Sequence, residues 1–311
     1  MRVQFVKAVH DVLAVDPRSM FITGDLGYNA LEKLSATFGR RFLNAGVAEQ
    51  NMIGAAAGMA LTGMRPWVYS IAPFATYRCL EQIRNDVCLH RFPVRLVGNG
   101  GGYTYGIMGS THHALEDLVV LRPLPNMQLF FPCSNDHVEK AVAQMATLSG
   151  PSYLRLSISP YTTEKAALTE HPETLTRHYA ARRDAEAPTV TIISVGHGVQ
   201  IALRALAADG LSAFNVDVFG VARFPWDFAA DFALLDSVKS SRNVIVVEEH
   251  YLNGGMAESL RLALPEVRTF RALSAAYSSD QRYGSPLFHL QQCGLTPENL
   301  VASVETVLGK Q

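Results

Sequence analysis

The sequence lacks the features that point to a membrane or a nucleic acid. It has no run of about 18 apolar residues, the length that a membrane-spanning helix needs. Its 27 basic and 28 acidic residues give a formal net charge of −1, and no lysine or arginine run marks a nucleic-acid-binding face or a polybasic anchor. We therefore predict small-molecule ligands, with neither a nucleic acid nor a membrane as partner.

Cysteine is scarce and unpaired in sequence. Cys79, Cys88, Cys133 and Cys293 form no C-x-x-C motif and stand in apolar surroundings, as the reduced thiols of cytoplasmic proteins do. The first residues also lack the apolar stretch and small-residue cleavage site of a secretory signal. The sequence therefore predicts a cytoplasmic protein without a catalytic thiol.

Apolar residues, by contrast, are abundant. They make up 48% of the chain against 18% charged residues, which suits buried cores and argues against disorder. A length of 311 residues predicts two domains. Apolar segments rich in β-branched residues alternate with helical patterns throughout. This alternation predicts an α/β fold with two doubly wound domains.

The expected elements follow this alternation. Strands of the first half are expected at 20–23, 42–45, 66–71, 94–98, 127–131 and 153–156. Its helices are expected at 3–14, 47–62, 74–89, 113–121 and 135–147. For the second half we expect strands at 189–195, 211–218 and 243–248, and helices at 198–208, 254–263 and 297–308.

The domain boundary is expected where apolar periodicity fails. Between 157 and 187 Thr, Glu, His, Arg and Pro accumulate, which is typical of an extended polar connector. We therefore predict a first domain over 1–160, a connector over 161–187 and a smaller second domain over 188–311. The last helix has a clear start, because Thr296 can cap it and Pro297 suits its first turn.

The most informative stretch is 44–60, where a strand ends and a helix begins. Gly46 can turn the chain, and Glu49 then stands in the first turn of a helix made largely of small and apolar residues. Open α/β sheets bind ligands at the carboxyl ends of their strands, which is where Glu49 would lie. The simpler interpretation is that Glu49 only complements the helix dipole.

Residues 48–52 (AEQNM), before a small-residue helix, resemble the pyrimidine-binding domain of transketolases and of deoxyxylulose-phosphate synthases. The resemblance implies thiamine diphosphate as cofactor. It also implies that Glu49 hydrogen-bonds N1′ of the aminopyrimidine ring and shares a proton with it. In that family this bond favours the imino tautomer, which activates the thiazolium carbon for attack on a substrate carbonyl.

Residues 70–77 (SIAPFATY) match the family segment whose aromatic side chains pack on the pyrimidine ring. The match assigns cofactor contacts to Phe74 and Tyr77, and to Ile71, which replaces the aromatic residue usual at the third position. An apolar, aromatic wall suits a flat heteroaromatic ring. Without the resemblance, Phe74 and Tyr77 would be interpreted as core residues at helical spacing.

Residues 106–117 (GIMGSTHHALED) resemble the family loop that ends in Thr-His-Gln before an acidic helix. The resemblance gives His112 the role of the active-site histidine, which contacts substrate oxygens and stabilises charge or moves protons. A rival interpretation makes His112, His113 and Glu116 metal ligands. Adjacent histidines point to different sides of a helix, so we predict no metal site on this chain.

Three positions depart from the family pattern on the substrate side. Gly100 stands where the family has a histidine, Met108 replaces an aspartate that contacts a sugar hydroxyl, and Ile158 falls near the arginine that grips the sugar phosphate. A buried phosphate without a cationic partner is costly. We expect a substrate other than a standard pentose phosphate bound in the standard manner, unless Arg155 replaces the lost cation.

The second half is also similar to the family. Residues 246–250 (VVEEH), Gly254-Gly255 and 294–299 (GLTPEN) resemble the C-terminal domain of transketolases and of 2-oxoacid dehydrogenase β subunits. We interpret these residues as structural and as subunit contacts.

The family's diphosphate-binding domain is expected to be absent. Gly24-Asp25 imitates its Gly-Asp-Gly motif, but Leu26 replaces the second glycine and Asn44 stands too close to be its asparagine. We expect no further domain upstream. The diphosphate and Mg²⁺ would then be held mainly by a separate subunit, in an α2β2 heterotetramer with a β–β contact, and this chain alone would be inactive.

The leading hypothesis is a subunit of a split transketolase-like enzyme that moves a two-carbon ketol or acyl unit between ketose- and aldose-type substrates. The nearest alternative is the β subunit of a 2-oxoacid dehydrogenase or decarboxylase. A third is a non-catalytic subunit that keeps the fold and has lost the cofactor. The presence of Glu49, Phe74, Tyr77 and His112 argues against this third hypothesis.

Overall fold

The computed structural model describes residues 1–161, 165–179, 189–277 and 282–309. The chain divides into two compact units. The first comprises Met1–Gly101 and Thr111–Ile158, and the second comprises Gly102–Ser110 and Ser159–Gln311. Each unit is built on its own mainly parallel sheet, so the predicted α/β class is confirmed.

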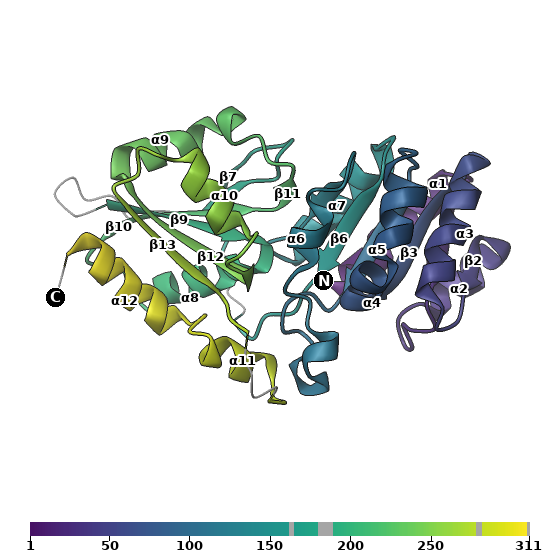
Figure 1. Ribbon diagram of the computed structural model, residues 1–311, viewed down its shortest axis with the longest axis horizontal. Coiled ribbons are helices and arrows are strands. Elements are labelled where there is room, and N and C mark those ends of the chain that lie inside the picture. The colour runs from purple at the N-terminus through teal and green to yellow at the C-terminus, as the bar shows by residue number, and fades with distance from the viewer. Residues whose placement is uncertain (162–164, 180–188, 278–281, 310–311) are drawn as a thin grey trace. The chain divides into compact units, whose positions relative to one another are not determined.

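The first unit alternates helices and strands along the chain (Figure 1). Its elements are α1 (Arg2–Val15), β1 (Ser19–Thr23), α2 (Glu32–Phe38), β2 (Phe42–Asn44), α3 (Glu49–Leu61), β3 (Arg65–Ile71), α4 (Ala72–Thr76), α5 (Leu80–Gln82), β4 (Arg95–Asn99), α6 (Asp117–Leu121), β5 (Gln128–Phe130), α7 (Asn135–Thr147) and β6 (Ser152–Leu156). The predicted strands all appear, with bounds shifted by at most one residue.

The sheet of the first unit carries helices on both faces. Its strands run parallel in the order β5-β6-β4-β3-β1-β2. Tyr69 stacks on Phe5 of α1 with ring centroids 5.8 Å apart, whereas the next residue, Ser70, bonds Glu49 of α3. Successive side chains of a strand point to opposite faces, so α1 and α3 cover opposite faces. This is the doubly wound arrangement that the sequence predicts.

The predicted helix over 74–89 is wrong as a single element. The chain passes from α4 through a 3₁₀ turn at Tyr77–Cys79 and through α5 to a π-helical segment at Ile83–Cys88. The Thr76 hydroxyl donates to the carbonyl of Ala72, a bond that bends helices. The apolar periodicity of the sequence does not register this local change of pitch.

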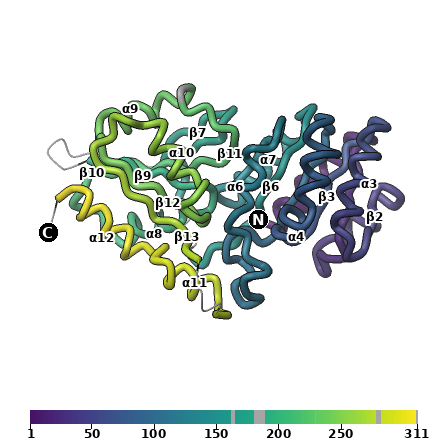
Figure 2. Tube along the Cα trace, in the orientation of Figure 1, coloured from purple at the N-terminus to yellow at the C-terminus, as the bar shows by residue number. Residues whose placement is uncertain are grey.

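The second unit adds a mixed sheet. Its elements are β7 (Ala167–Glu170), β8 (Arg177–Tyr179), β9 (Thr189–Val195), α8 (Val199–Ala207), β10 (Asn215–Val221), β11 (Arg223–Phe224), α9 (Phe232–Ser241), β12 (Asn243–Tyr251), α10 (Met256–Ala263), β13 (Thr269–Ala275), α11 (Pro286–Gln292) and α12 (Pro297–Leu308). The sheet order is β13-β12-β9-β10-β8-β7, with β7 and β8 antiparallel to their neighbours. Helix α12 packs beside α8 (Figure 2).

Strands β7 and β8 correct the predicted connector over 161–187. They extend the second sheet, and Arg177 bridges to Glu170 at 2.6 Å across the pair. Strands this short, with charged and polar side chains, have no alternation of apolar residues to reveal them. Residues 162–164 and 180–187 of that predicted connector lie outside the described residues.

The start of α12 agrees with its prediction. Thr296 is the N-cap, its side chain accepts the amide hydrogen of Asn299, and Pro297 occupies the first turn. The predicted strand at 211–218 begins later, at Asn215, because Leu211 to Phe214 form a turn. Within the described residues, no helix is long and apolar enough to cross a membrane.

Candidate functional site

Glu49 lies at the start of α3, near the carboxyl ends of β1 and β3. Its side chain is only 2% exposed. Oε1 accepts a hydrogen bond from Ser70 Oγ at 3.1 Å, and Oε2 accepts one from Arg78 Nη1 at 2.7 Å. An acid that only complemented the helix dipole would need neither partner nor burial. The fold therefore holds this carboxylate in a fixed position near the carboxyl ends of the strands.

Arg78 joins Glu49 to Phe74. Its guanidinium carbon lies 4.2 Å from the centroid of the Phe74 ring, within the range of a cation–π contact, while one nitrogen bonds Glu49. The Arg78 side chain is 40% exposed, so this contact is open to solvent on one side. The predicted acid and the predicted aromatic wall thus meet through Arg78, which is not among the predicted site residues.

His112 reaches the same cluster. Its ring meets the Phe74 ring edge-on, with centroids 5.1 Å apart and an interplanar angle of 68°. Nδ1 lies 3.0 Å from the hydroxyl of Thr111. The structure therefore brings three of the predicted site residues, Glu49, Phe74 and His112, into one connected group.

Tyr77 lies next to this group and is held by its hydroxyl. The phenol donates to Glu116 Oε2 at 2.9 Å and accepts the backbone amide of Glu116 at 3.0 Å. Burial, followed by the charges of Asp117 and Glu116, raises the pKa of Tyr77 above its ordinary range, so the phenol remains a donor. Glu116 is engaged in this contact and in a bond from Leu115 N, not with His112 or His113.

Tyr77→Phe should destabilise the first unit by about 1–2 kcal/mol, because both bonds to Glu116 disappear in a largely buried place. Urea unfolding followed by Trp67 fluorescence, with every variant carrying Trp226→Phe, measures this effect. Tyr28, which is 84% exposed, supplies the matched control, and Tyr28→Phe should change stability by less than about 0.5 kcal/mol. Equal midpoints for the two variants would show that the bonds to Glu116 contribute nothing.

Ile71 and Gly100 lie at the ends of adjacent strands. Ile71 is the last residue of β3 and pairs in register with Asn99 of β4, directly before Gly100. Gly100 has φ +88°, in the region that favours glycine, and its amide donates to the carbonyl of Leu156 at 2.9 Å. Both predicted residues therefore lie at the carboxyl ends of the strands, as Glu49 does.

Arg155, considered as a substitute phosphate-binding cation, has a structural partner. It is 4% exposed and bonds the fully buried Asp117 at 3.1 Å, while Asp117 also accepts the hydroxyl of Tyr153 at 2.8 Å. A Cβ on Gly101 would collide with the Arg155 side chain. A guanidinium committed to a buried carboxylate is poorly suited to bind a substrate phosphate as well.

Met108 and Ile158 are both exposed to solvent. Met108 is 49% exposed in a 3₁₀ turn at Gly106–Met108 of the second unit, and Ile158 is 64% exposed at the end of the first. An apolar side chain at Ile158 offers no charge to a phosphate. The substrate roles predicted from Met108 and Gly100 stay predictions.

Two other kinds of site were considered in the sequence, a reactive thiol and a metal site. Burial, and then the charge of Glu49, raises the pKa of Cys79 to about 12, so its thiol stays protonated near neutral pH. Among residues 1–161, 165–179, 189–277 and 282–309, no group of three His, Cys, Asp or Glu side chains could hold a metal ion.

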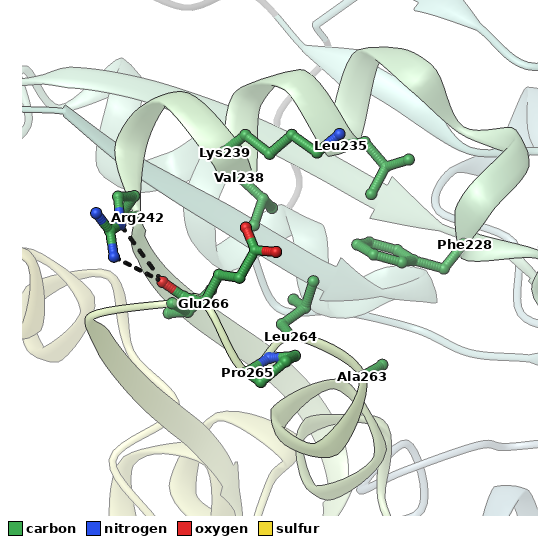
Figure 3. A pocket seen from close by; sticks show the side chains of 10 residues that line it. Phe228, Leu235, Val238, Lys239, Arg242, Ala263, Leu264, Pro265 and Glu266 are labelled. Atoms are coloured by element: carbon green, nitrogen blue, oxygen red, sulfur yellow. Dashed lines mark hydrogen bonds between the residues drawn. The ribbon is translucent and has the colours of Figure 1, made fainter.

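A separate cavity of about 580 Å³ lies in the second unit, between α9 and residues 263–267. Phe228, Val238 and Leu264 line it with apolar surface, and Figure 3 shows Arg242 bonding the backbone oxygen of Glu266 at its border. None of the predicted site residues lines this cavity. Its volume suits a small ligand, but its lining shows no cluster of groups that would catalyse a reaction.

Sequence reasoning missed two residues of the site. Arg78 stands four residues after Phe74, a spacing that places side chains on one helix face, so it could have been found as a cation beside the aromatic wall. Gly24, set aside with the imitated diphosphate motif, approaches the acid closely. A Cβ there would lie 3.3 Å from Ser70 Oγ and 3.4 Å from Glu49 Oε1.

Comparison with known proteins adds family matches over most of the chain. The family model for the transketolase pyrimidine-binding domain matches residues 1–163, and that for the transketolase C-terminal domain matches residues 179–295. An apulose-4-phosphate transketolase chain of Actinobacillus succinogenes, one of the subunits of that enzyme, is 31% identical over 237 residues. The match covers 74% of this chain and 71% of that protein.

Two further relatives extend the similarity. A 6-deoxy-6-sulfo-D-fructose transketolase subunit of a Clostridium species is 29% identical over 273 residues, covering 86% of this chain and 81% of its own. Among solved structures, a split-gene transketolase described as an inactive β4 tetramer has a TM-score of 0.78 and 25% identity. That match covers 99% of this chain and 98% of the other.

Proposed function

This chain belongs to the transketolase family, and on that premise we propose that Glu49 is the residue that binds the aminopyrimidine ring of thiamine diphosphate. The chain is a subunit of a split transketolase-type transferase, which moves a two-carbon ketol unit between ketose- and aldose-type substrates. The family depends on thiamine diphosphate. When bound, that cofactor supplies the nucleophilic carbon that attacks the substrate carbonyl.

The single observation that carries the proposal is the buried carboxylate of Glu49 beside a half-buried aromatic face. A flat, cationic heteroaromatic ring needs an acceptor at one edge and an apolar wall on its face, and Glu49 with Phe74 supplies both. Gly24 packs closely on the acid, since a Cβ there would lie 3.4 Å from Glu49 Oε1. The residues present therefore fit the aminopyrimidine ring.

Each residue then has a distinct task. Glu49 would hold a proton at the ring nitrogen, and the hydroxyl of Ser70 would keep the carboxylate oriented. Phe74 would pack on the ring, with Ile71 and the ring of Tyr77 completing the apolar surround. His112 would donate a hydrogen bond to substrate oxygens from the edge of Phe74.

We assign the diphosphate and Mg²⁺ mainly to a separate partner subunit, in an α2β2 heterotetramer. The structural relative described as an inactive β4 tetramer supports this, because the β chains of that protein lack activity when they assemble alone. The relatives named for apulose-4-phosphate and 6-deoxy-6-sulfo-D-fructose support a ketose-type substrate other than a standard pentose phosphate. Ile158, in place of a phosphate-binding cation, points the same way.

The experiment is to purify the chain with its partner subunit and assay it with thiamine diphosphate and Mg²⁺. Hydroxypyruvate and ketoses should act as two-carbon donors to aldehyde acceptors, and the chain alone should show no turnover. Pyruvate as the sole effective donor would favour the 2-oxoacid decarboxylase alternative. A complex that binds no thiamine diphosphate by calorimetry would contradict the central claim.

A further inference from the structure

Arg78 makes the two contacts that the proposed function reserves for the cofactor ring. It lies over the face of Phe74, with the guanidinium carbon 4.2 Å from the ring centroid, and it bonds Glu49 Oε2 at 2.7 Å. A guanidinium is planar, cationic and a donor through its edge. A protonated aminopyrimidine ring has these same three properties.

We propose that Arg78 is an internal stand-in for the aminopyrimidine: in the free chain its guanidinium occupies the ring's place between Glu49 and Phe74, and it yields that place when thiamine diphosphate binds. This inference rests on the proposed function and deepens it. It names a residue that sets cofactor affinity without belonging to the acid and aromatic wall that the family motif provides.

The surroundings of Arg78 favour such an exchange. Glu49 is almost fully buried, and a buried carboxylate without a partner is costly, so the free chain gains from an internal cation. Ser70 bonds the other oxygen of Glu49, so the carboxylate can keep its orientation while its second partner changes. Arg78 itself is 40% exposed, so its charged group can move into water without crossing the core.

The stand-in has a defined effect on cofactor binding. The cofactor must displace a charge-assisted hydrogen bond and a cation–π contact before its ring can bind, so part of its binding free energy is spent on that displacement. Removing the guanidinium should remove the competition. We expect Arg78→Met, in the complex with the partner subunit, to lower the Kd for thiamine diphosphate about tenfold.

Isothermal titration calorimetry of the complex with thiamine diphosphate and Mg²⁺ measures this change. Arg78→Lys, which keeps the charge without the planar fork, should fall between wild type and Arg78→Met, and it serves as the second variant if the methionine variant folds poorly. Arg84→Met is the matched control. Arg84 is an exposed arginine bonded to Asn85, and this substitution should leave Kd unchanged.

A small cation provides a direct test of occupancy. Methylguanidinium, at concentrations that do not unfold the protein, should weaken cofactor binding to Arg78→Met and have little effect on wild type, whose own guanidinium already fills the place. A wild-type complex that binds the cofactor, with an Arg78→Met complex that binds it equally well or more weakly, would overturn the inference and leave the proposed function standing. A wild-type complex that binds none would overturn both.

Discussion

Glu49→Gln is expected to lower kcat about 10²–10⁴-fold, the range that a positioned proton-transfer group contributes. Glutamine keeps the size and the hydrogen-bonding edge of the side chain but cannot hold the proton that a carboxyl shares with the ring nitrogen. Ser70 can still bond the amide oxygen, so the variant should fold and assemble with its partner. The loss should therefore fall on the chemical step more than on cofactor binding.

Two measurements separate these effects. Calorimetry gives the Kd for thiamine diphosphate, and hydrogen–deuterium exchange at C2 of the bound cofactor, followed by NMR, reports its activation. We expect the exchange rate to fall far more than the affinity. Equal exchange rates in wild type and Glu49→Gln would remove Glu49 from its assigned role.

Glu32→Gln is the matched control, because Glu32 is also an acid in the first turn of a helix but is exposed on α2. If Glu49 only complemented its helix dipole, the two variants would behave alike. The control thus tests the simpler interpretation that the sequence left open.

Residues that belong to a short family motif could be picked out from the sequence. Glu49, Phe74 and His112 stand in short blocks that match the family, and side-chain contacts through Arg78 and Phe74 connect them in the structure. The strands of the parallel sheets could also be predicted, because buried parallel strands form continuous apolar runs. These features are local in the sequence, and local patterns predict them.

Residues that depend on distant partners could not be predicted in this way. The spacing of Arg78 to Phe74 is local, but its bond to Glu49 spans 29 positions, and the bond of Arg155 to Asp117 spans 38. Strand β7 lies at the sheet edge and β8 lies between β7 and β10; both are short and carry polar residues, so neither shows an alternating apolar pattern. In each case the deciding contact or strand pairing joins residues far apart in the sequence. A pattern within one short segment cannot predict such a contact.

The largest stability effect is expected at the buried pair of Asp117 and Arg155. Asp117→Ala should destabilise the first unit by about 3–5 kcal/mol, because a guanidinium only 4% exposed loses its carboxylate and the hydroxyl of Tyr153 loses an acceptor. Urea unfolding followed by Trp67 fluorescence isolates this unit if every variant carries Trp226→Phe, which removes the other tryptophan.

The double variant Asp117→Ala with Arg155→Met should be more stable than Asp117→Ala alone, since removing both charges leaves no uncompensated ion in the core. Glu139→Ala, which breaks the exposed pair with Lys7, is the matched control and should cost less than about 1 kcal/mol. If Asp117→Ala costs no more than Glu139→Ala, the buried pair does not stabilise the unit.

The same pair also affects the site. A Cβ on Gly101 would collide with Arg155, and one on Gly98 would come within 2.8 Å of Tyr153 Cε2, so both side chains pack directly on the glycine segment that ends β4. Asp117 fixes both of them. Asp117→Ala should therefore loosen the backbone at Gly100 as well as lower stability. Faster amide hydrogen exchange at Gly100 and Gly101, whose amides bond the carbonyl of Leu156, would reveal that coupling under conditions where the unit stays folded.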